Sequence, residues 1–246
     1  MSLANLQTDA TIENETDSIG GNGPWASGAY PGTITMAYMD TSAGGAKSIT
    51  IHMKDSSGRE LRTTEWVVSG NAKGNKNYYE KDGVKNYLPG FNNINSLCLL
   101  ATGKEVGQLE TEDKIVSLYD YQARAEKPRT VPVFVDLIGT EIIAGVLLQT
   151  VDKNVKQDDG SYAPSGETRD ENVVNKYFRA KDKMTTAEIR AQAEVPEFFN
   201  KWEKDKTGIV VNKTSKTGAG NKATPSKAFG GTPTPAAKPQ TSLFAA

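Results

Sequence analysis

The chain has 246 residues, with 29 lysines and arginines against 30 aspartates and glutamates, one cysteine and one histidine. A length of this size predicts one or two domains. Because a structural zinc site takes about four Cys or His ligands and a disulfide joins two cysteines, Cys98 and His52 supply neither. We expect no metal and no cofactor.

The ends of the chain carry opposite charges. Residues 1–46 hold five acidic and no basic residues, for a charge of −5, and residues 206–246 hold six lysines and no acid, for +6. Blocks of like charge often act as interaction arms. The pattern therefore indicates either a polyanionic partner or a contact between the two ends, and equally well fits two ends that are merely solvated.

Composition divides the chain into three parts. Residues 1–24 are polar and acidic without hydrophobic periodicity, which predicts a flexible segment. Residues 25–205 form the body, and residues 206–246 are rich in Pro, Gly, Thr and Lys, as disordered tails are. The apolar stretches of the body are far shorter than the roughly 20 residues of a membrane span. With no secretion signal at the start, we expect a soluble cytosolic protein without membrane contact.

The first half of the body predicts strands. Residues 33–39 and 47–54 alternate polar and apolar side chains on either side of Gly44-Gly45, and residues 60–68 follow the next turn. These three segments predict an antiparallel meander. Turns every 8–12 residues or so favour a small barrel or sandwich over alternating β and α units.

The second half adds further strands and short helices. A helix is expected over 92–103, between Asn caps and a final glycine, and another where Thr185 and Glu188 fit a capping box. The expected strands are 114–121, a hairpin of 131–139 with 140–152 that turns near Gly139, and 172–178. Phe198, Phe199 and Trp202 are expected to pack the last helix onto the body. The fold class is mainly β, with five or six strands and one or two short helices.

Catalytic arrangements are not apparent. No phosphate-binding glycine loop is present, and His52 lies in an alternating strand where an ordinary sheet residue is expected rather than a base. Cys98 falls in the apolar face of an expected helix, and the paired carboxylates lie in turn-like, exposed stretches. We therefore expect a protein that is not an enzyme.

Residues 69–91 carry the strongest functional signal. Four lysines against two acids are interleaved with four aromatic residues on a Gly-rich segment that we expect to be mobile. Lysines neutralise phosphates while aromatic faces stack on bases, which together make a site for single-stranded nucleic acid. The alternative is a hairpin whose tyrosines cover the mouth of a barrel and whose lysines are simply solvated.

Other aromatic residues could extend such a site. Trp66 and Tyr38 lie on expected strands, and Tyr119 and Tyr121 share one face of another because side chains repeat every two residues. Such a pair is either a stacking platform or the edge of the core. Arg124 follows that strand and adds positive charge.

The order of several motifs resembles phage-encoded single-stranded DNA-binding proteins of the podovirus type. The resemblance covers about residues 25–180 and rests on the motifs Gly28-Ala-Tyr-Pro-Gly32, Gly58-Arg-Glu-Leu61 to Trp66-Val-Val68, Tyr87-Leu-Pro-Gly90, Ile94-Asn-x-Leu97 and Val133 to Gly139. It implies an OB-like β-barrel that coats DNA in phage replication and recombination in the host cytoplasm, or one that assists a phage RNA polymerase. Many such proteins end in an acidic tail, whereas this tail is basic.

We therefore expect binding of single-stranded DNA by an OB-like barrel, with replication, recombination or RNA polymerase proteins as further partners through the termini. The alternative from another class is a virion or other structural interaction protein with a β-sandwich body. The sequence does not indicate the oligomeric state. The expected DNA-contacting residues are Trp66, Lys73, Lys76, Tyr78, Tyr79, Lys81, Lys85, Tyr87, Tyr119, Tyr121 and Arg124.

Overall fold

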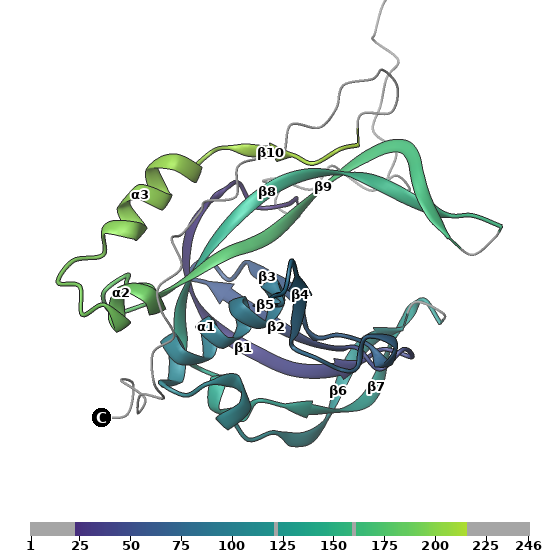
Figure 1. Cartoon of the computed structure of the whole chain (residues 1–246), viewed down its shortest axis with the longest axis horizontal. Helices are drawn as coiled ribbons and strands as arrows, with labels where there is room; N and C mark the ends of the chain where they lie inside the picture. The colour runs from purple at the N-terminus through teal and green to yellow at the C-terminus, as the bar shows by residue number, and fades with distance from the viewer. Residues whose placement is uncertain (1–22, 121–122, 159–160, 216–246) are drawn as a thin grey trace, which may run out of the picture.

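The computed structural model describes residues 23–120, 123–158 and 161–215, whose ten strands and three α-helices make a mainly β, largely antiparallel fold (Figure 1). The expected fold class is confirmed at that level. Most residues of the two terminal segments that we expect to be flexible, 1–24 and 206–246, lie outside the described residues.

Strands β1 (Gly28–Thr41), β2 (Lys47–Asp55) and β3 (Glu60–Val68) form the expected meander. Each pairs antiparallel with the next, over registers such as Ala37↔Ile51 and Ile51↔Thr63. Alternation along β2 turns Ile49, Ile51 and Met53 into the core. The meander is therefore set by the two-residue period read from the sequence.

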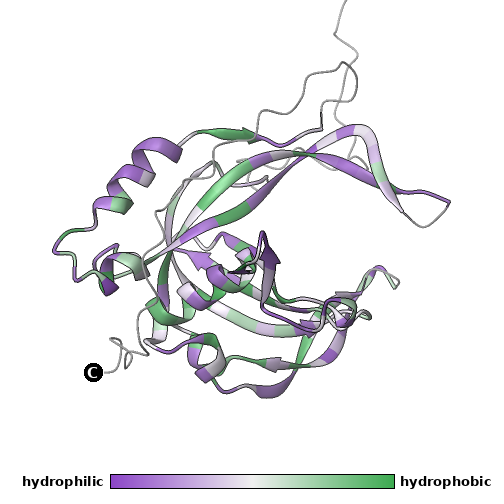
Figure 2. Cartoon of the chain, in the orientation of Figure 1, coloured by the Kyte–Doolittle hydropathy of each residue, from purple (hydrophilic) through white to green (hydrophobic). Residues whose placement is uncertain are grey.

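Strands β8 (Glu141–Lys156) and β9 (Tyr162–Arg179) form a long ribbon. The first residues of β8 pair with β1, and β9 pairs with β8 along nearly its whole length. The outer part of the ribbon extends beyond the body and is mostly hydrophilic (Figures 1 and 2). The expected strand 172–178 is thus only the base of β9, because the outer residues are exposed on both faces and show no apolar alternation.

The prediction that residues 131–139 and 140–152 form a hairpin is wrong. Residues up to Val133 belong to β7 (Ala125–Val133), which pairs with β6 (Glu112–Asp120) instead. A short 3₁₀ turn, η3 (Val135–Leu137), then leads through Gly139, at a φ of 82°, into β8. The prolines of β7 at 128 and 132 concealed its start, since proline inside a run argues against a strand.

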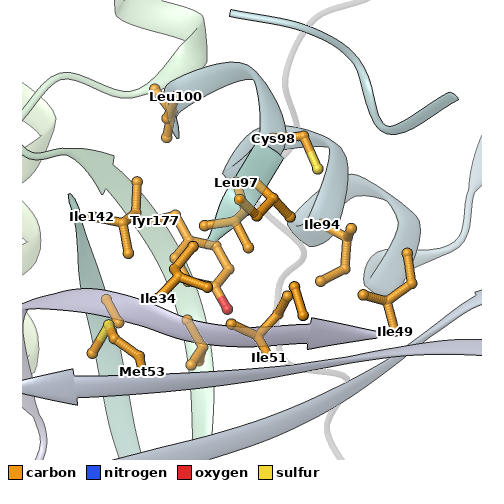
Figure 3. Packing of buried hydrophobic residues seen from close by; sticks show 14 of the residues in the cluster. Ile34, Ile49, Ile51, Met53, Ile94, Leu97, Cys98, Leu100, Ile142 and Tyr177 are labelled. Atoms are coloured by element: carbon orange, nitrogen blue, oxygen red, sulfur yellow. The ribbon is translucent and has the colours of Figure 1, made fainter. Parts of the chain in front are cut away.

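Helix α1 (Pro89–Thr102) supplies one side of the core. It begins before the expected Asn92, because Pro89 is pre-organised for the first helical position. It ends as expected at Gly103, whose φ of 78° lets its N–H donate to the Leu99 carbonyl. Its buried side chains, among them Ile94 and Leu97, pack with Tyr177 against residues of β1 and β2 (Figure 3).

Helix α3 (Glu197–Lys206) covers the other face of the β8–β9 sheet, whereas α2 (Thr186–Arg190) packs through Ile189 against the core that contains α1. The expected capping box at Thr185 is confirmed: its hydroxyl accepts from the Glu188 N–H, and Glu188 accepts in return. Phe199 and Trp202 of α3 are buried against Phe178, whereas Phe198 is largely exposed. The base of the ribbon therefore lies between α1 on one face and α3 on the other.

The body extends past its expected end at residue 205. Lys206 closes α3, and β10 (Val210–Asn212) pairs in parallel with Leu148–Thr150 of β8. Ser215 then donates hydrogen bonds to the Asp152 carboxylate. The expected boundary came too early because β10 has only three residues, and its stability depends on the edge that β8 offers where the pairing with β1 stops.

A closed barrel of five or six strands is not what the described residues form. The main sheet has eight strands, with β3 paired to β2 and β9 paired to β8, and no ladder joins β3 to β9 in the described part of the chain. Strands β4 (Tyr78–Lys81) and β5 (Val84–Tyr87) form a separate two-stranded sheet.

Candidate nucleic-acid interface

Residues 69–91, which we call the Lys/Tyr segment, contain a folded hairpin. The segment contains a 3₁₀ turn, η1 (Asn71–Lys73), and the β4–β5 pair. Asp82 and Gly83 connect the two strands at φ values of 53° and 75°. Two successive positive φ values suit a tight hairpin, because they match the twist of the flanking strands. A hairpin at this position is the conformation that the alternative interpretation of residues 69–91 predicted.

Backbone contacts hold the hairpin against the β1–β2 turn. Asn71 donates its N–H to the Gly44 carbonyl over 2.8 Å, and Ser69 and Lys76 close the base of the segment over 2.8 Å. Gly45 has a φ of 78°, and a Cβ there would lie 2.2 Å from the Asn71 side-chain oxygen. The turn between β1 and β2 therefore determines where the hairpin stands.

A cavity of about 760 Å³ opens between this hairpin, the end of β3, the β1–β2 turn and the first turn of α1. Five of the expected site residues border it: Trp66, Lys73, Lys76, Tyr78 and Tyr79. Trp66 is 52% exposed and Tyr79 is 45% exposed, so both rings have free surface. Large apolar side chains left open beside a cavity are typical of a binding site.

Three expected residues of the hairpin lie away from the cavity lining. Lys81 lies at the hairpin tip, and the Lys85 ammonium lies 5.2 Å from the centre of the Tyr78 ring. Tyr87 packs on Phe91 with ring centres 5.1 Å apart.

The aromatic residues of the hairpin do not form one platform. Neighbouring residues of a strand point to opposite faces, so Tyr78 and Tyr79 diverge although both border the cavity. The ammonium of Lys76, 5.4 Å from the Tyr78 ring centre, and that of Lys85 occupy cation–π positions on Tyr78. Tyr78 thus orients two lysines, whereas Trp66 and Tyr79 are better placed to stack on a ligand.

The lysines of the hairpin form no ion pair, as is also true of other cations in the described residues, such as Lys47 and Lys156. In the described part of the chain, Lys73, Lys76, Lys81 and Lys85 have no carboxylate partner. On the β6–β7 and β8–β9 strand pairs several lysines are ion-paired, for example Lys127 with Asp120 and Lys153 with Glu167. A phosphate that binds at the hairpin would therefore not have to displace a carboxylate from these lysines.

The β6–β7 residues are separate from the cavity. Tyr119 is 47% exposed opposite Glu126, and Arg124 occupies the connecting turn at a φ of 51°. Neither borders the cavity, and Tyr121 lies outside the described residues. Tyr38, the other strand aromatic, is buried, and its hydroxyl accepts from Arg62 over 3.1 Å. It is a core residue.

The two residues with reactive side chains lie elsewhere. His52 Nδ1 is 2.7 Å from Glu60 Oε1 on the neighbouring strand, and Cys98 is buried in α1 as expected. Burial raises the pKa of the Cys98 thiol to about 12. That thiol is not activated for nucleophilic chemistry.

Sequence reasoning missed Glu65, Gly90 and Asn93. Glu65 borders the cavity and receives a hydrogen bond from Asn93 of α1, and Gly90 lies against Trp66. Burial raises the pKa of the Glu65 carboxyl, and the Asn93 hydrogen bond only partly opposes it. A signal was available: Glu65 occupies the inward position of β3 between the apolar pattern of Leu61 and Val67.

Comparisons with known proteins give no match, either to a protein-family model or to a curated protein. Within residues 23–120, 123–158 and 161–215, no three His, Cys, Asp or Glu side chains are grouped as a metal ion would require. None of the helices in these ranges has the length and apolar character needed to cross a membrane.

Proposed function

We propose that this protein binds single-stranded DNA, without catalysis, at the cavity beside the β4–β5 hairpin. One observation carries the proposal: the exposed rings of Trp66 and Tyr79 and the unpaired ammonium groups of Lys73 and Lys76 border the same cavity. Aromatic faces and unpaired cations on one rim suit a chain whose bases and phosphates alternate.

In the proposed complex, bases stack on Trp66 and Tyr79 while phosphates run past the lysines. Stacking contributes about 1–3 kcal/mol for each base and tolerates any sequence, because every base has a π face. A duplex hides those faces inside its stack. The arrangement therefore predicts a preference for single strands.

We further propose that the body is OB-like. The strand order β3-β2-β1-β8-β9, with α1 following the meander in the chain, supports this. OB-folds are partly open five-stranded barrels that bind oligonucleotides on strands 2 and 3 and in the loops after strands 1 and 4. The cavity uses β3 and the β1–β2 turn. The strands β6 and β7 are then an insertion before the fourth strand of the barrel.

The resemblance to phage single-stranded DNA-binding proteins extends the proposal to a biological role. That role is to coat exposed strands during replication and recombination. A cofactor of a phage RNA polymerase would use the same groove on a melted promoter. A structural interaction protein is the outcome if DNA does not bind.

Fluorescence anisotropy tests the binding directly. A labelled single strand of about 30 nucleotides, long enough for several OB-fold sites, is titrated beside its duplex at two salt concentrations. The variant is Trp66→Ala with Tyr79→Ala. The control is Tyr162→Ala, which removes a tyrosine that is 69% exposed on the β8–β9 ribbon, away from the cavity.

We expect tight, salt-sensitive binding to the single strand, weaker binding to the duplex, and a loss of at least about tenfold in the double variant from two lost stacking contacts. The Tyr162 variant should bind like the wild type. Equal weak binding to both DNA forms, or equal losses in the two variants, would overturn the proposal.

A further inference from the structure

Glu65 is an acidic residue in a cavity otherwise suited to an anionic polymer. It occupies an inward position of β3, where Leu61 and Val67 are buried, and it is itself half-buried beside α1. A carboxylate here repels phosphate. Its presence requires either a structural role or a ligand group that donates hydrogen bonds.

Asn93 fixes the orientation of that carboxylate. Its side-chain nitrogen donates to Glu65 Oε1 over 3.1 Å and to the Val174 carbonyl over 2.8 Å. Glu65 Oε2 lies over Gly90 in the cavity wall, 3.1 Å from where a Cβ of that residue would be. Among the described residues, Asn93 is the donor that reaches Glu65, so Oε2 is left as an acceptor toward the cavity.

The edges of the bases differ in what they offer such an acceptor. Cytosine and adenine carry exocyclic amino groups that donate, and guanine carries one as well. Thymine has no amino group, and its single N–H lies between two carbonyl oxygens that a carboxylate repels. Trp66, whose exposed ring is a stacking surface, borders the same cavity as Glu65.

We propose that Glu65 is a specificity-determining residue, which makes the cavity favour a base with an exocyclic amino group over thymine. This inference rests on the proposed binding of single-stranded DNA and deepens it. Base stacking then supplies affinity for any sequence, and the Glu65 carboxylate adds a preference at one position of the bound strand.

The variant Glu65→Gln tests the proposal because Asn93 constrains the new amide. The amide oxygen must take the place of Oε1, since Asn93 donates to it, and the amide nitrogen then faces the cavity as a donor. The acceptor thereby becomes a donor, which favours the carbonyl oxygens of thymine. The control is Glu80→Gln, which removes the same charge from an exposed residue that borders the same cavity.

Affinities for oligo(dC) and oligo(dT) are measured by anisotropy, at a pH where cytosine is unprotonated. We expect the ratio of dC to dT affinity to fall at least about tenfold in Glu65→Gln, the scale of a hydrogen bond to a charged group. It should stay unchanged in Glu80→Gln. Preserved binding with an unchanged ratio in Glu65→Gln, or the same change in both variants, would overturn the role of Glu65.

A second measurement uses the wild-type protein and therefore does not depend on whether a variant folds. A strand in which 2-pyrimidinone replaces cytosine has a hydrogen where the amino group was, and the wild-type protein should bind it several-fold more weakly than oligo(dC). Equal affinity would overturn the proposal. If the wild-type protein binds no single strand at all, the proposed function itself fails, and with it the inference about Glu65.

Discussion

Gly90 lies against the backbone of Trp66 so closely that a Cβ at Gly90 would come within 2.5 Å of the Trp66 carbonyl oxygen. The first turn of α1 therefore rests directly on β3. Both residues border the cavity, so this approach sets the distance between two of its walls.

Gly90→Ala should displace α1 from β3. Backbone on the opposing strand cannot yield as a flexible side chain would, so we expect a loss of about 1–3 kcal/mol in the free energy of unfolding. Denaturant titration measures it. Gly107→Ala is the matched control, because a Cβ there meets nothing within 4 Å. Equal stability of the two variants would show that α1 adjusts freely.

Lys73→Gln with Lys76→Gln should flatten the salt dependence of DNA binding. Each phosphate contact on a single strand contributes about 0.7 to the slope of log affinity against log salt, so the pair should remove about 1.4. The control pair is Lys127→Gln with Lys153→Gln, whose ammonium groups are paired to carboxylates on the ribbons. A slope that changes equally in both pairs would refute a dedicated phosphate path at the hairpin.

Truncation after Ser215 should weaken binding through charge alone. Residues 216–246 hold four lysines and no acid. The shortened chain keeps β10 and the Ser215 contact to Asp152, which truncation at 205 would remove. We expect the salt slope to fall by at least about 0.7, the value of one phosphate contact. An unchanged slope, measured by the same anisotropy titration, would mean that this segment stays away from DNA.

Glu65→Gln should stabilise the fold at neutral pH but hardly at pH 4. Burial raises the pKa of Glu65 in the folded protein above its ordinary value of 4.5, so folding favours the protonated carboxyl. That stability is fully present below the unfolded pKa and is lost as pH rises through the folded pKa. Thermal melting against pH gives the comparison. A stability difference that is the same at both pH values would contradict it.

Tyr177→Phe should raise stability. The Tyr177 hydroxyl is buried in the core and has no hydrogen-bond partner among the described residues. Burial raises the pKa of this phenol far above its usual range, so it stays neutral. Removing an unsatisfied hydroxyl while keeping the ring should gain about 1 kcal/mol. A lower melting temperature for the variant would mean that the hydroxyl has a partner.

Local patterns were sufficient for several elements that bury one face. Alternation predicted the β1–β2–β3 meander, and the Thr185–Glu188 box and Gly103 marked one helix start and one helix end. These signals depend on neighbours within a few residues, which the chain order itself supplies.

Sequence patterns failed to predict strands whose two faces are both exposed, and strands that pair only with a segment far away in the sequence. The outer part of β9 has no buried face, β7 contains prolines, and β10 is stable only on the free edge of β8. Composition also identified the Lys/Tyr segment as the candidate site. It could not indicate that Tyr87 packs on Phe91 or that Tyr119 and Arg124 lie on a separate ribbon.

The aromatic rings and lysines of the candidate site were readable from residues 66–79 alone, because they lie close together in the chain. The shape of the site was not, because the cavity exists only where the β1–β2 turn, β3, the hairpin and α1 meet. Glu65 borders the cavity because its side chain occupies an inward position of β3, and Gly90 borders it because the first turn of α1 packs on that strand. Such contacts join residues far apart in sequence, and packing in three dimensions decides them.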